Sequence, residues 1–370
     1  MKIQPFQLER YFAQYEFSAP YLLSPSDCEP FTLAELLALA DSNTRRQWDD
    51  LWLGYTESRG LPALRAEAAA LCERITTEDI LILTPEEGIF IAMNALLKPG
   101  DHVAATFPGY QSLYQIAESL GCTVSRWMPR DEGGALRFNT DDLEALLRAD
   151  TRLLVFNFPH NPTGALPSQE EYRRLLALAE ARGLYVFADE MYRFLEYDPR
   201  HRLPAACDLD PNAVSLFGVS KSFALPGLRI GWLATQNTDL MTQLANFKDY
   251  TTICSSAPSE VLALIALRSR EQVLRRNLDI VRANLDTLDA FFARHPRTFH
   301  WTRPKAGTIA FPEYLGPQDV DAFCADLVAR KGVMLVPASV FDYPGQNFRL
   351  GFGRRNLPRA LAKLEEYLDE

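Results

Sequence analysis

Short apolar runs alternate with helix-length segments between about residues 62 and 270. The runs contain few polar residues, which is typical of parallel strands that are buried on both faces of a sheet. Segments such as Ser168–Arg182 place apolar residues at helical spacing. This alternation predicts a three-layer α/β domain, in which a mostly parallel sheet has helices on both faces. The expected strands are Ile80–Leu83, Val103–Thr106, Thr123–Trp127, Leu153–Phe156, Leu184–Ala188, Val214–Val219 and Ile230–Ala234.

The pattern changes after about residue 270. A long helical stretch, Glu271 to Arg294, leads to short strand candidates and a closing helix near 357–367. We expect a smaller α+β domain here, with strands at Thr308–Phe311, Val333–Val336 and Phe348–Gly351. The expected division is residues 1–45 as an N-terminal arm and part of the small domain, 46–274 as the large domain, and 275–370 as the small C-terminal domain.

Composition excludes several classes of protein. The 370-residue chain has a formal net charge of −10, whereas nucleic acids and anionic membranes attract basic surfaces. Neither a signal-peptide core nor a membrane-spanning run is present, so we expect a soluble, cytoplasmic protein. The six cysteines are scattered singly, and we expect buried thiols and no metal site.

Three polar clusters follow strand-like runs. Lys221 comes just after Val214–Val219, with Arg229 eight residues on; Asp189 and Tyr192 follow a second strand, and the segment from Asn157 to Gly164 follows a third. Ligands of such sheets bind beyond the carboxyl ends of the strands. The three clusters should therefore meet at one edge of the sheet.

The chemistry of these clusters points to one cofactor. A lysine in apolar surroundings loses hydration, which lowers its pKa and frees its amine as a nucleophile. An arginine suits a phosphate, and a buried carboxylate needs a cation such as a protonated ring nitrogen. Together these groups suit pyridoxal phosphate.

The order and spacing of these motifs, from about Gly54 to Arg354, resemble a fold-type I pyridoxal phosphate enzyme of the class I/II aminotransferase group. The resemblance implies that Lys221 forms a Schiff base with the cofactor and then shuttles the substrate α-proton. It implies that Asp189 keeps the pyridine nitrogen protonated, and Tyr192, three residues on, is expected on the same face of a helix that follows the strand. The other cofactor contacts that it implies are Tyr192 and Asn161 on the phenolate oxygen, Tyr110 stacked on the ring, and Arg229, Ser220 and the Thr84 hydroxyl at the phosphate.

The resemblance also assigns groups at the edges of the site. Arg349 corresponds to the arginine that grips the substrate α-carboxylate through two parallel hydrogen bonds. Tyr55 resembles a tyrosine that reaches the phosphate of the neighbouring subunit, which implies a homodimer with shared active sites. Ordinary structural roles stay open: Lys221 and Arg349 as surface residues, Asp189 as a helix N-cap, Tyr110 as a core aromatic and Asn161 as part of a tight turn.

The phosphate loop departs from the family pattern. The family has a small-residue loop at a helix N-terminus, whereas this chain has Thr84-Pro85-Glu86-Glu87-Gly88, and Gly218 stands where a hydroxyl is usual. Pro85 lacks an N–H, and Glu86 brings negative charge to an anion site. The same residues suit a plain helix start, with Thr84 as N-cap and Glu87 as its capping-box partner.

The N-terminal segment departs as well. Leu8 to Phe12 and Ser26 to Leu36 look similar to the start of capreomycidine- and enduracididine-forming cyclases, which act on hydroxylated arginine. In that case Glu9, Asp27 or Glu86 could pair with a guanidinium. The alternative is that these acids form a solvated face.

The leading hypothesis is a pyridoxal phosphate-dependent aminotransferase that moves an amino group between an amino acid and a 2-oxo acid. The alternative is a pyridoxal phosphate-dependent lyase or cyclase that acts on a hydroxylated arginine-type substrate. A regulator with an aminotransferase-like sensor is disfavoured, because the acidic chain has no basic patch for DNA.

Overall fold

The computed structural model describes residues 2–133 and 135–370. A seven-stranded sheet forms the centre of the larger part, in the order β2-β10-β9-β8-β7-β3-β4. Strand β10 runs antiparallel to both of its neighbours, and every other pairing in the sheet is parallel. The strands are β2 (Ile80–Leu83), β3 (His102–Thr106), β4 (Thr123–Trp127), β7 (Thr151–Asn157), β8 (Tyr185–Asp189), β9 (Ala213–Gly218) and β10 (Gly231–Ala234).

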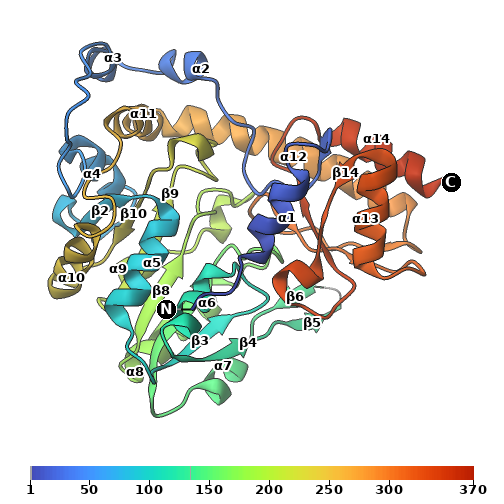
Figure 1. Ribbon diagram of the computed structural model, residues 1–370, viewed down its shortest axis with the longest axis horizontal. Coiled ribbons are helices and arrows are strands. Elements are labelled where there is room, and N and C mark those ends of the chain that lie inside the picture. The colour runs from blue at the N-terminus through green and yellow to red at the C-terminus, as the bar shows by residue number, and fades with distance from the viewer. Residues whose placement is uncertain (1, 134) are drawn as a thin grey trace.

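Helices cover both faces of this sheet (Figure 1). On one face, alternate strand residues such as Leu153 and Leu216 pack into the same cluster as residues of three of the helices. On the other face, Ile82 and Val186 belong to two further hydrophobic clusters, which also contain residues of five helices. The first set is α5 (Pro85–Leu96), α6 (Ser112–Ser119) and α10 (Thr238–Lys248), and the second is α4 (Pro62–Ala69), α7 (Thr140–Leu146), α8 (Gln169–Ala181), α9 (Ala206–Leu209) and α11 (Ala257–Arg268). The predicted three-layer α/β architecture is confirmed.

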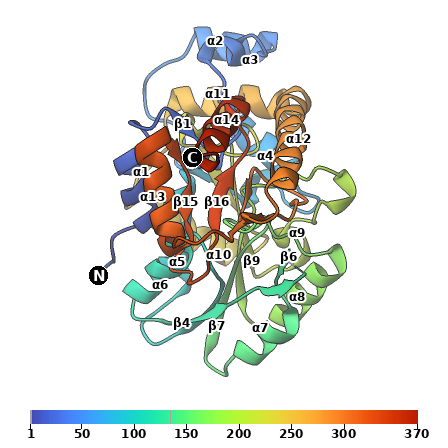
Figure 2. The ribbon, with the colours of Figure 1, turned by 90° about the vertical axis from the view of Figure 1, so that its right-hand side faces the viewer.

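The C-terminal part forms a smaller α+β unit, in which α13 and α14 lie beside short strands (Figure 2). The long α12 (Arg270–Arg294) leads into it. The predicted strand over 333–336 is divided into two, because β14 pairs with the N-terminal β1 whereas β15 pairs with β16. The remaining elements are β11 (Phe299–His300), β12 (Ile309–Ala310), β13 (Glu313–Tyr314), α13 (Val320–Lys331), β14 (Val333–Met334), β15 (Val336–Pro337), β16 (Phe348–Gly351) and α14 (Leu357–Leu368).

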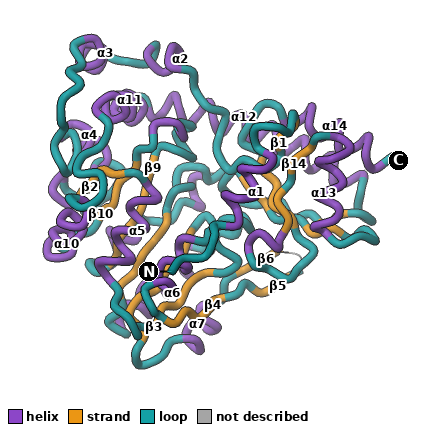
Figure 3. The backbone as a smooth tube through the Cα atoms, in the orientation of Figure 1, coloured by secondary structure: helices purple, strands orange, loops and turns teal. Residues whose placement is uncertain are grey.

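The N-terminal segment crosses between the two parts. Helix α1 (Gln7–Tyr15) packs on the small unit, and β1 (Tyr21–Leu22) pairs in parallel with β14. Helices α2 (Leu33–Leu37) and α3 (Ser42–Asp49) then project at the edge of the large part, joined to it by long loops (Figure 3). A two-stranded hairpin, β5 (Arg130–Glu132) and β6 (Ala135–Arg137), and four short 3-10 helices complete the described elements: η1 (Thr77–Asp79), η2 (Pro199–His201), η3 (Pro226–Leu228) and η4 (Ala338–Phe341). No helix among the described residues combines the length and apolar character needed to cross a membrane.

Candidate active site

The carboxyl ends of β7, β8 and β9 open onto one cavity of about 370 Å³. The N-terminal helix α1, the start of α5 and strand β16 complete its walls. The clusters, which are far apart in the sequence, therefore meet at one edge of the sheet, as the placement rule predicts. The predicted site residues in the wall are Glu86, Tyr110, Asn161, Asp189, Tyr192, Ser220, Lys221, Arg229 and Arg349.

Lys221 lies three residues beyond the end of β9, and its Nζ donates a hydrogen bond to Ser26 Oγ at 2.7 Å. Burial lowers the pKa of this amine, and the nearby cations Arg349 and Arg229 act in the same direction. A lowered pKa raises the fraction of neutral, nucleophilic amine near pH 7. Lys221 is thus directed into the cavity and away from the surface.

Asp189 is the last residue of β8 and is only 6% exposed. Burial raises the pKa of its carboxyl group to about 7, although the Met191 N–H at 3.1 Å and the charge of Lys221 oppose this. Asn157 holds the strand end in place, since its amide donates to the Asp189 carbonyl at 2.9 Å. Its side-chain oxygen also accepts the Asn161 N–H at 2.7 Å. A buried carboxyl group of this kind is suited to a cationic partner that a ligand brings.

A helix was expected at Tyr192, but Tyr192 lies in a turn that follows β8 directly. The turn forms because Glu190 N–H bonds back to the Leu216 carbonyl on β9, and Arg193 N–H then bonds to Glu190. The outcome for the side chain is similar, because the Tyr192 ring lines the cavity at 5.9 Å from Lys221 Nζ.

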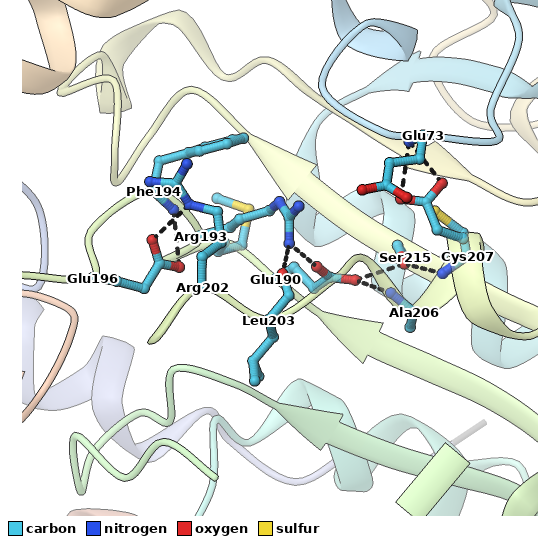
Figure 4. A network of polar contacts seen from close by, with 12 residues as sticks. Glu73, Glu190, Arg193, Phe194, Glu196, Arg202, Leu203, Ala206, Cys207 and Ser215 are labelled. Carbon is cyan, nitrogen blue, oxygen red and sulfur yellow. Dashed lines mark hydrogen bonds and ion pairs between the residues drawn. The ribbon is translucent and has the colours of Figure 1, made fainter. Parts of the chain in front are cut away.

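A buried polar network supports this turn from behind (Figure 4). Glu190 Oε1 accepts hydrogen bonds from Ser215 Oγ at 2.7 Å and from the Ala206 N–H at 2.8 Å. Arg193 lies 3.5 Å from the other oxygen of the same carboxylate. Two consecutive acids therefore face opposite ways, with Asp189 in the cavity and Glu190 in the scaffold.

A group of potential metal donors lies beside this network. Cys72, Cys207 and Asp208 bring their donor atoms within 4.8 Å of one another. The Asp208 carboxylate, however, already accepts the N–H groups of Glu73 and Arg74. Its position is explained by that bonding alone.

Arg349 is 1% exposed, so it is not a surface arginine. Its guanidinium donates to the Ser24 carbonyl at 2.9 Å and to Asn161 Oδ1 at 3.3 Å. The rings of Phe12 and Phe341 lie 5.5 and 5.4 Å away. Arg349 Nε has no partner among the described residues, so a buried cation lines the cavity with a donor still free.

Helix α5 starts as predicted, with Thr84 as N-cap and Pro85 as its first residue. The Thr84 N–H bonds to Glu87 Oε2 at 3.3 Å, whereas the Thr84 hydroxyl donates to the Arg229 carbonyl at 3.0 Å. Thr84 is not in the cavity wall. Its hydroxyl instead fixes Arg229 beside the helix start.

The glycine at 218 follows from the packing of Pro85. A Cβ at Gly218 would lie 3.0 Å from Pro85 Cγ and 2.8 Å from Met191 Cε. A Cβ at Gly231 would lie 2.7 Å from the same Pro85 atom. Pro85 and Met191 thus occupy the space that a hydroxyl side chain at 218 would need. The proline at 85 and the glycine at 218, which both depart from the family pattern, therefore fit each other in the packing.

Tyr55 lies outside this cavity and is 87% exposed. Its loop lies beside the loop around 250–255, to which Thr56 Oγ1 is joined by a 3.1 Å hydrogen bond to the Ser255 carbonyl. Both loops expose large apolar side chains, namely Trp52, Leu53, Tyr250 and Ile253.

Sequence reasoning singled out the segment that starts at Ser26 but missed the contact of Ser26 with Lys221. Strand β1 brings this segment across the cavity, where Ser26 contacts Lys221 and Asp27 forms a two-bond pair with Arg354 at 3.0 and 3.1 Å. Asp27 therefore does pair with a guanidinium, but with one of the chain's own. A signal was present: a Cβ at Gly351 would lie 1.9 Å from the Pro25 carbonyl oxygen, so the Leu-Gly-Phe-Gly motif marks a close backbone approach.

The unpaired polar groups in the cavity wall match the chemistry of pyridoxal phosphate. The Tyr192 hydroxyl, Ser220 Oγ and Arg349 Nε are buried and have no partner among the described residues. Lys221 offers an amine to an aldehyde, and Asp189 offers an acid to a ring nitrogen. Buried polar groups normally find partners, so these atoms suit a polar ligand.

Comparison with known proteins agrees with this chemistry. The family model of aminotransferase class I and II matches residues 33–364. The chain belongs to this family of fold-type I, pyridoxal phosphate-dependent enzymes.

Particular relatives differ in activity. Capreomycidine synthase of Streptomyces vinaceus is 32% identical over 98% of this chain and 93% of its own. A pyridoxal phosphate-dependent aminotransferase from Streptococcus suis superposes with a TM-score of 0.93 at 29% identity, over 100% of this chain and 98% of its own. The structure of the pyridoxal phosphate-dependent cyclase OrfR superposes with a TM-score of 0.89 at 28% identity, over 100% of this chain and 98% of its own.

Proposed function

We propose that the chain is an aminotransferase that moves an amino group between an amino acid and a 2-oxo acid, with Lys221 as its catalytic residue. The observation that carries this proposal is the convergence of Lys221, Asp189 and Arg349 on one cavity. An amine of lowered pKa, a buried acid and a buried guanidinium with a free donor are the three groups that the reaction requires.

Each residue has a distinct task in this proposal. When bound, pyridoxal phosphate supplies an aldehyde carbon for amino groups and a pyridinium ring that accepts electrons. Asp189 holds the proton on the ring nitrogen. Lys221 Nζ takes the proton from the substrate α-carbon and returns it, and its bond to Ser26 orients it. Arg349 binds the substrate carboxylate and thereby fixes the direction of the α-hydrogen.

The remaining wall residues bind the cofactor. Tyr192 and Asn161 would donate to its phenolate oxygen, and Tyr110 would hold its ring. Arg229 and Ser220 bind the phosphate. Their position in one cavity wall supports these assignments.

We also propose the division into residues 46–274, which bind the cofactor, and residues 1–45 and 275–370, which contribute the small domain. The pairing of β1 with β14 supports placing the N-terminus with the C-terminal unit. Helices α2 and α3 contact α11 of the large part, so within the arm we assign only the segment up to β1 to the small domain.

The active unit that we propose is a homodimer. The exposed side chains of Trp52, Leu53, Tyr55, Tyr250 and Ile253 gather on two adjacent loops, and such patches mark interfaces. Tyr55 would then reach the phosphate of the partner's site. Sedimentation of the loaded enzyme at two concentrations tests this: a dimer is expected, and an active monomer would contradict it.

A lyase or cyclase that acts on a hydroxylated arginine-type substrate is the second candidate. It is favoured by the similarity to capreomycidine synthase, and by two acids that line the cavity, Glu9 on α1 and Glu16 just after the end of that helix. Both candidates start with removal of the α-proton, so the residues around Lys221 serve either.

One experiment separates the candidates. The purified enzyme is mixed with single amino acids, including arginine and hydroxyarginines, with and without a 2-oxo acid. Keto-acid formation together with conversion of the cofactor to its amine form supports transfer. Loss of water without need for a 2-oxo acid supports the lyase, and no change with any amino acid contradicts both.

A further inference from the structure

Helix α5 begins in the wall of the cofactor cavity and defines its anion-binding end. Pro85, Glu86 and Ile89 line the cavity, and the twelve-residue helix directs its N-terminus there. A helix N-terminus attracts anions, since its first N–H groups are free and its dipole is positive at that end. The Thr84 hydroxyl holds the Arg229 backbone beside this point.

The charges of the cavity place the cofactor phosphate at the same end. Arg354 is neutralised by Asp27, and Arg349 contacts Ser24 and Asn161 in the substrate part of the cavity. Arg229 is the cation that remains for a phosphate. The buried Ser220 hydroxyl, which has no partner among the residues described, lines the same cavity and is a second donor.

Glu86 brings a carboxyl group to this anion site. Burial raises the pKa of Glu86, and the nearby Glu9 of α1 acts in the same direction. Tyr110, Ser112 and Arg229 face the same group and oppose the shift. The carboxyl group of Asp189, whose own pKa Glu86 helps to raise, also interacts with it. A carboxylate here would repel a phosphate, whereas a protonated carboxyl group carries an O–H that can donate to it.

Pro85 and its packing leave the anion site short of hydrogen-bond donors, which a protonated Glu86 could supply. Pro85 has no N–H for the phosphate, and together with Met191 it leaves no room for a hydroxyl side chain at position 218. The site therefore lacks an N–H donor at position 85 and a hydroxyl donor at position 218. A proton on Glu86 replaces one of them.

We propose that Glu86 takes up a proton when pyridoxal phosphate binds and donates a hydrogen bond to the phosphate, so that cofactor retention falls as pH rises. This inference rests on the proposed function only through the identity of the cofactor. The phosphate dianion raises the pKa of Glu86 further. The contribution of the Glu86 proton to cofactor binding is therefore complete below the pKa that Glu86 has in the cofactor-free enzyme. It is lost as pH rises through the pKa that Glu86 has with the cofactor bound.

Glu87 provides a matched control in the same helical turn. It carries the same charge, but its carboxylate bonds to the Thr84 N–H and the hydroxyls of Thr251 and Thr252, outside the cavity wall. Removal of its charge changes the helix end in the same way without changing the cavity.

The test is equilibrium dialysis of the loaded enzyme between pH 6 and 9, which gives the Kd of pyridoxal phosphate. Pyridoxal, which lacks the phosphate, serves as the second probe. We expect Glu86→Gln, whose amide imitates the protonated acid, to bind pyridoxal phosphate about tenfold more tightly than the native enzyme at pH 8.5. The difference should shrink as pH falls, and at the low end of the range Glu86→Ala, which has no donor, should bind more weakly than both.

Pyridoxal binding should be the same in the native enzyme and Glu86→Gln, and Glu87→Gln should follow the native pH profile. Equal profiles for native and Glu86→Gln enzymes, or an equal shift with pyridoxal, would overturn the inference while Lys221 still carries the cofactor. If Lys221 does not carry the cofactor in any of these proteins, the proposed function itself fails.

Discussion

Replacement of Arg349 by methionine separates substrate recognition from stability. Arg349 is a buried cation that has neutral oxygens of Ser24 and Asn161 as its partners, and burial lowers its pKa. We propose that its carboxylate partner arrives with the substrate. Two charge-assisted hydrogen bonds at about 1.5 kcal/mol each amount to about 3 kcal/mol, which corresponds to a loss of about 150-fold in kcat/KM.

The same replacement should leave the substrate-free enzyme about as stable as before. A buried charge without an ionic partner gains little for the fold, and methionine fills a similar volume. Arg354→Met is the control, because it leaves Asp27, which is 5% exposed, without its partner. As Arg354 is itself partly exposed, we expect that variant to lose about 2 kcal/mol.

Two assays check this contrast: initial rates with the best amino acid of the panel, and urea unfolding of both variants without substrate. The expected result is a large kinetic loss with unchanged stability for Arg349→Met. A kinetic loss below tenfold, or a larger loss of stability than in Arg354→Met, would refute the assignment of Arg349 to the substrate.

Two further variants test the cofactor pocket. Asp189→Asn should stabilise the cofactor-free protein at pH 8 by at most about 4 kcal/mol. The reason is that the pKa of the Asp189 carboxyl group is raised to about 7 in the folded protein, so its ionisation costs stability as pH rises from the pKa of an ordinary aspartate through 7. The variant should also release the cofactor faster, and a lower stability than the native protein at pH 8 would contradict this. Gly218→Ser should destabilise by about 1–3 kcal/mol through contact with Pro85 and Met191, and Pro85→Ala should restore part of the loss. Thermal unfolding of single and double variants measures this coupling, and additive effects would contradict it.

Much of the large domain could be predicted from hydrophobic periodicity, because most strands of its sheet are buried and largely apolar, such as β2, β8 and β10. In the large sheet β2 and β4 have the predicted ends, and in the smaller unit β16 does too. The placement of Lys221 and Asp189 at one sheet edge followed from the same pattern, since parallel strands share their carboxyl ends.

The missed features depend on long-range contacts. The division of residues 333–336 arises from pairing with β1, more than three hundred residues away in the chain. The contact of Ser26 with Lys221 arises from the same crossing, and no local pattern marks a serine in a loop. The turn at Tyr192 replaces a helix because the backbone of Glu190 bonds to the neighbouring strand.

The central claim is that Lys221 Nζ forms the covalent link to pyridoxal phosphate. Borohydride reduction of the purified enzyme converts a carbon–nitrogen double bond into a stable single bond, and peptide mass mapping then locates the label. We expect the pyridoxyl group on Lys221 alone, and no label in Lys221→Ala. A label on another lysine, or equal labelling of Lys221→Ala, would contradict the account.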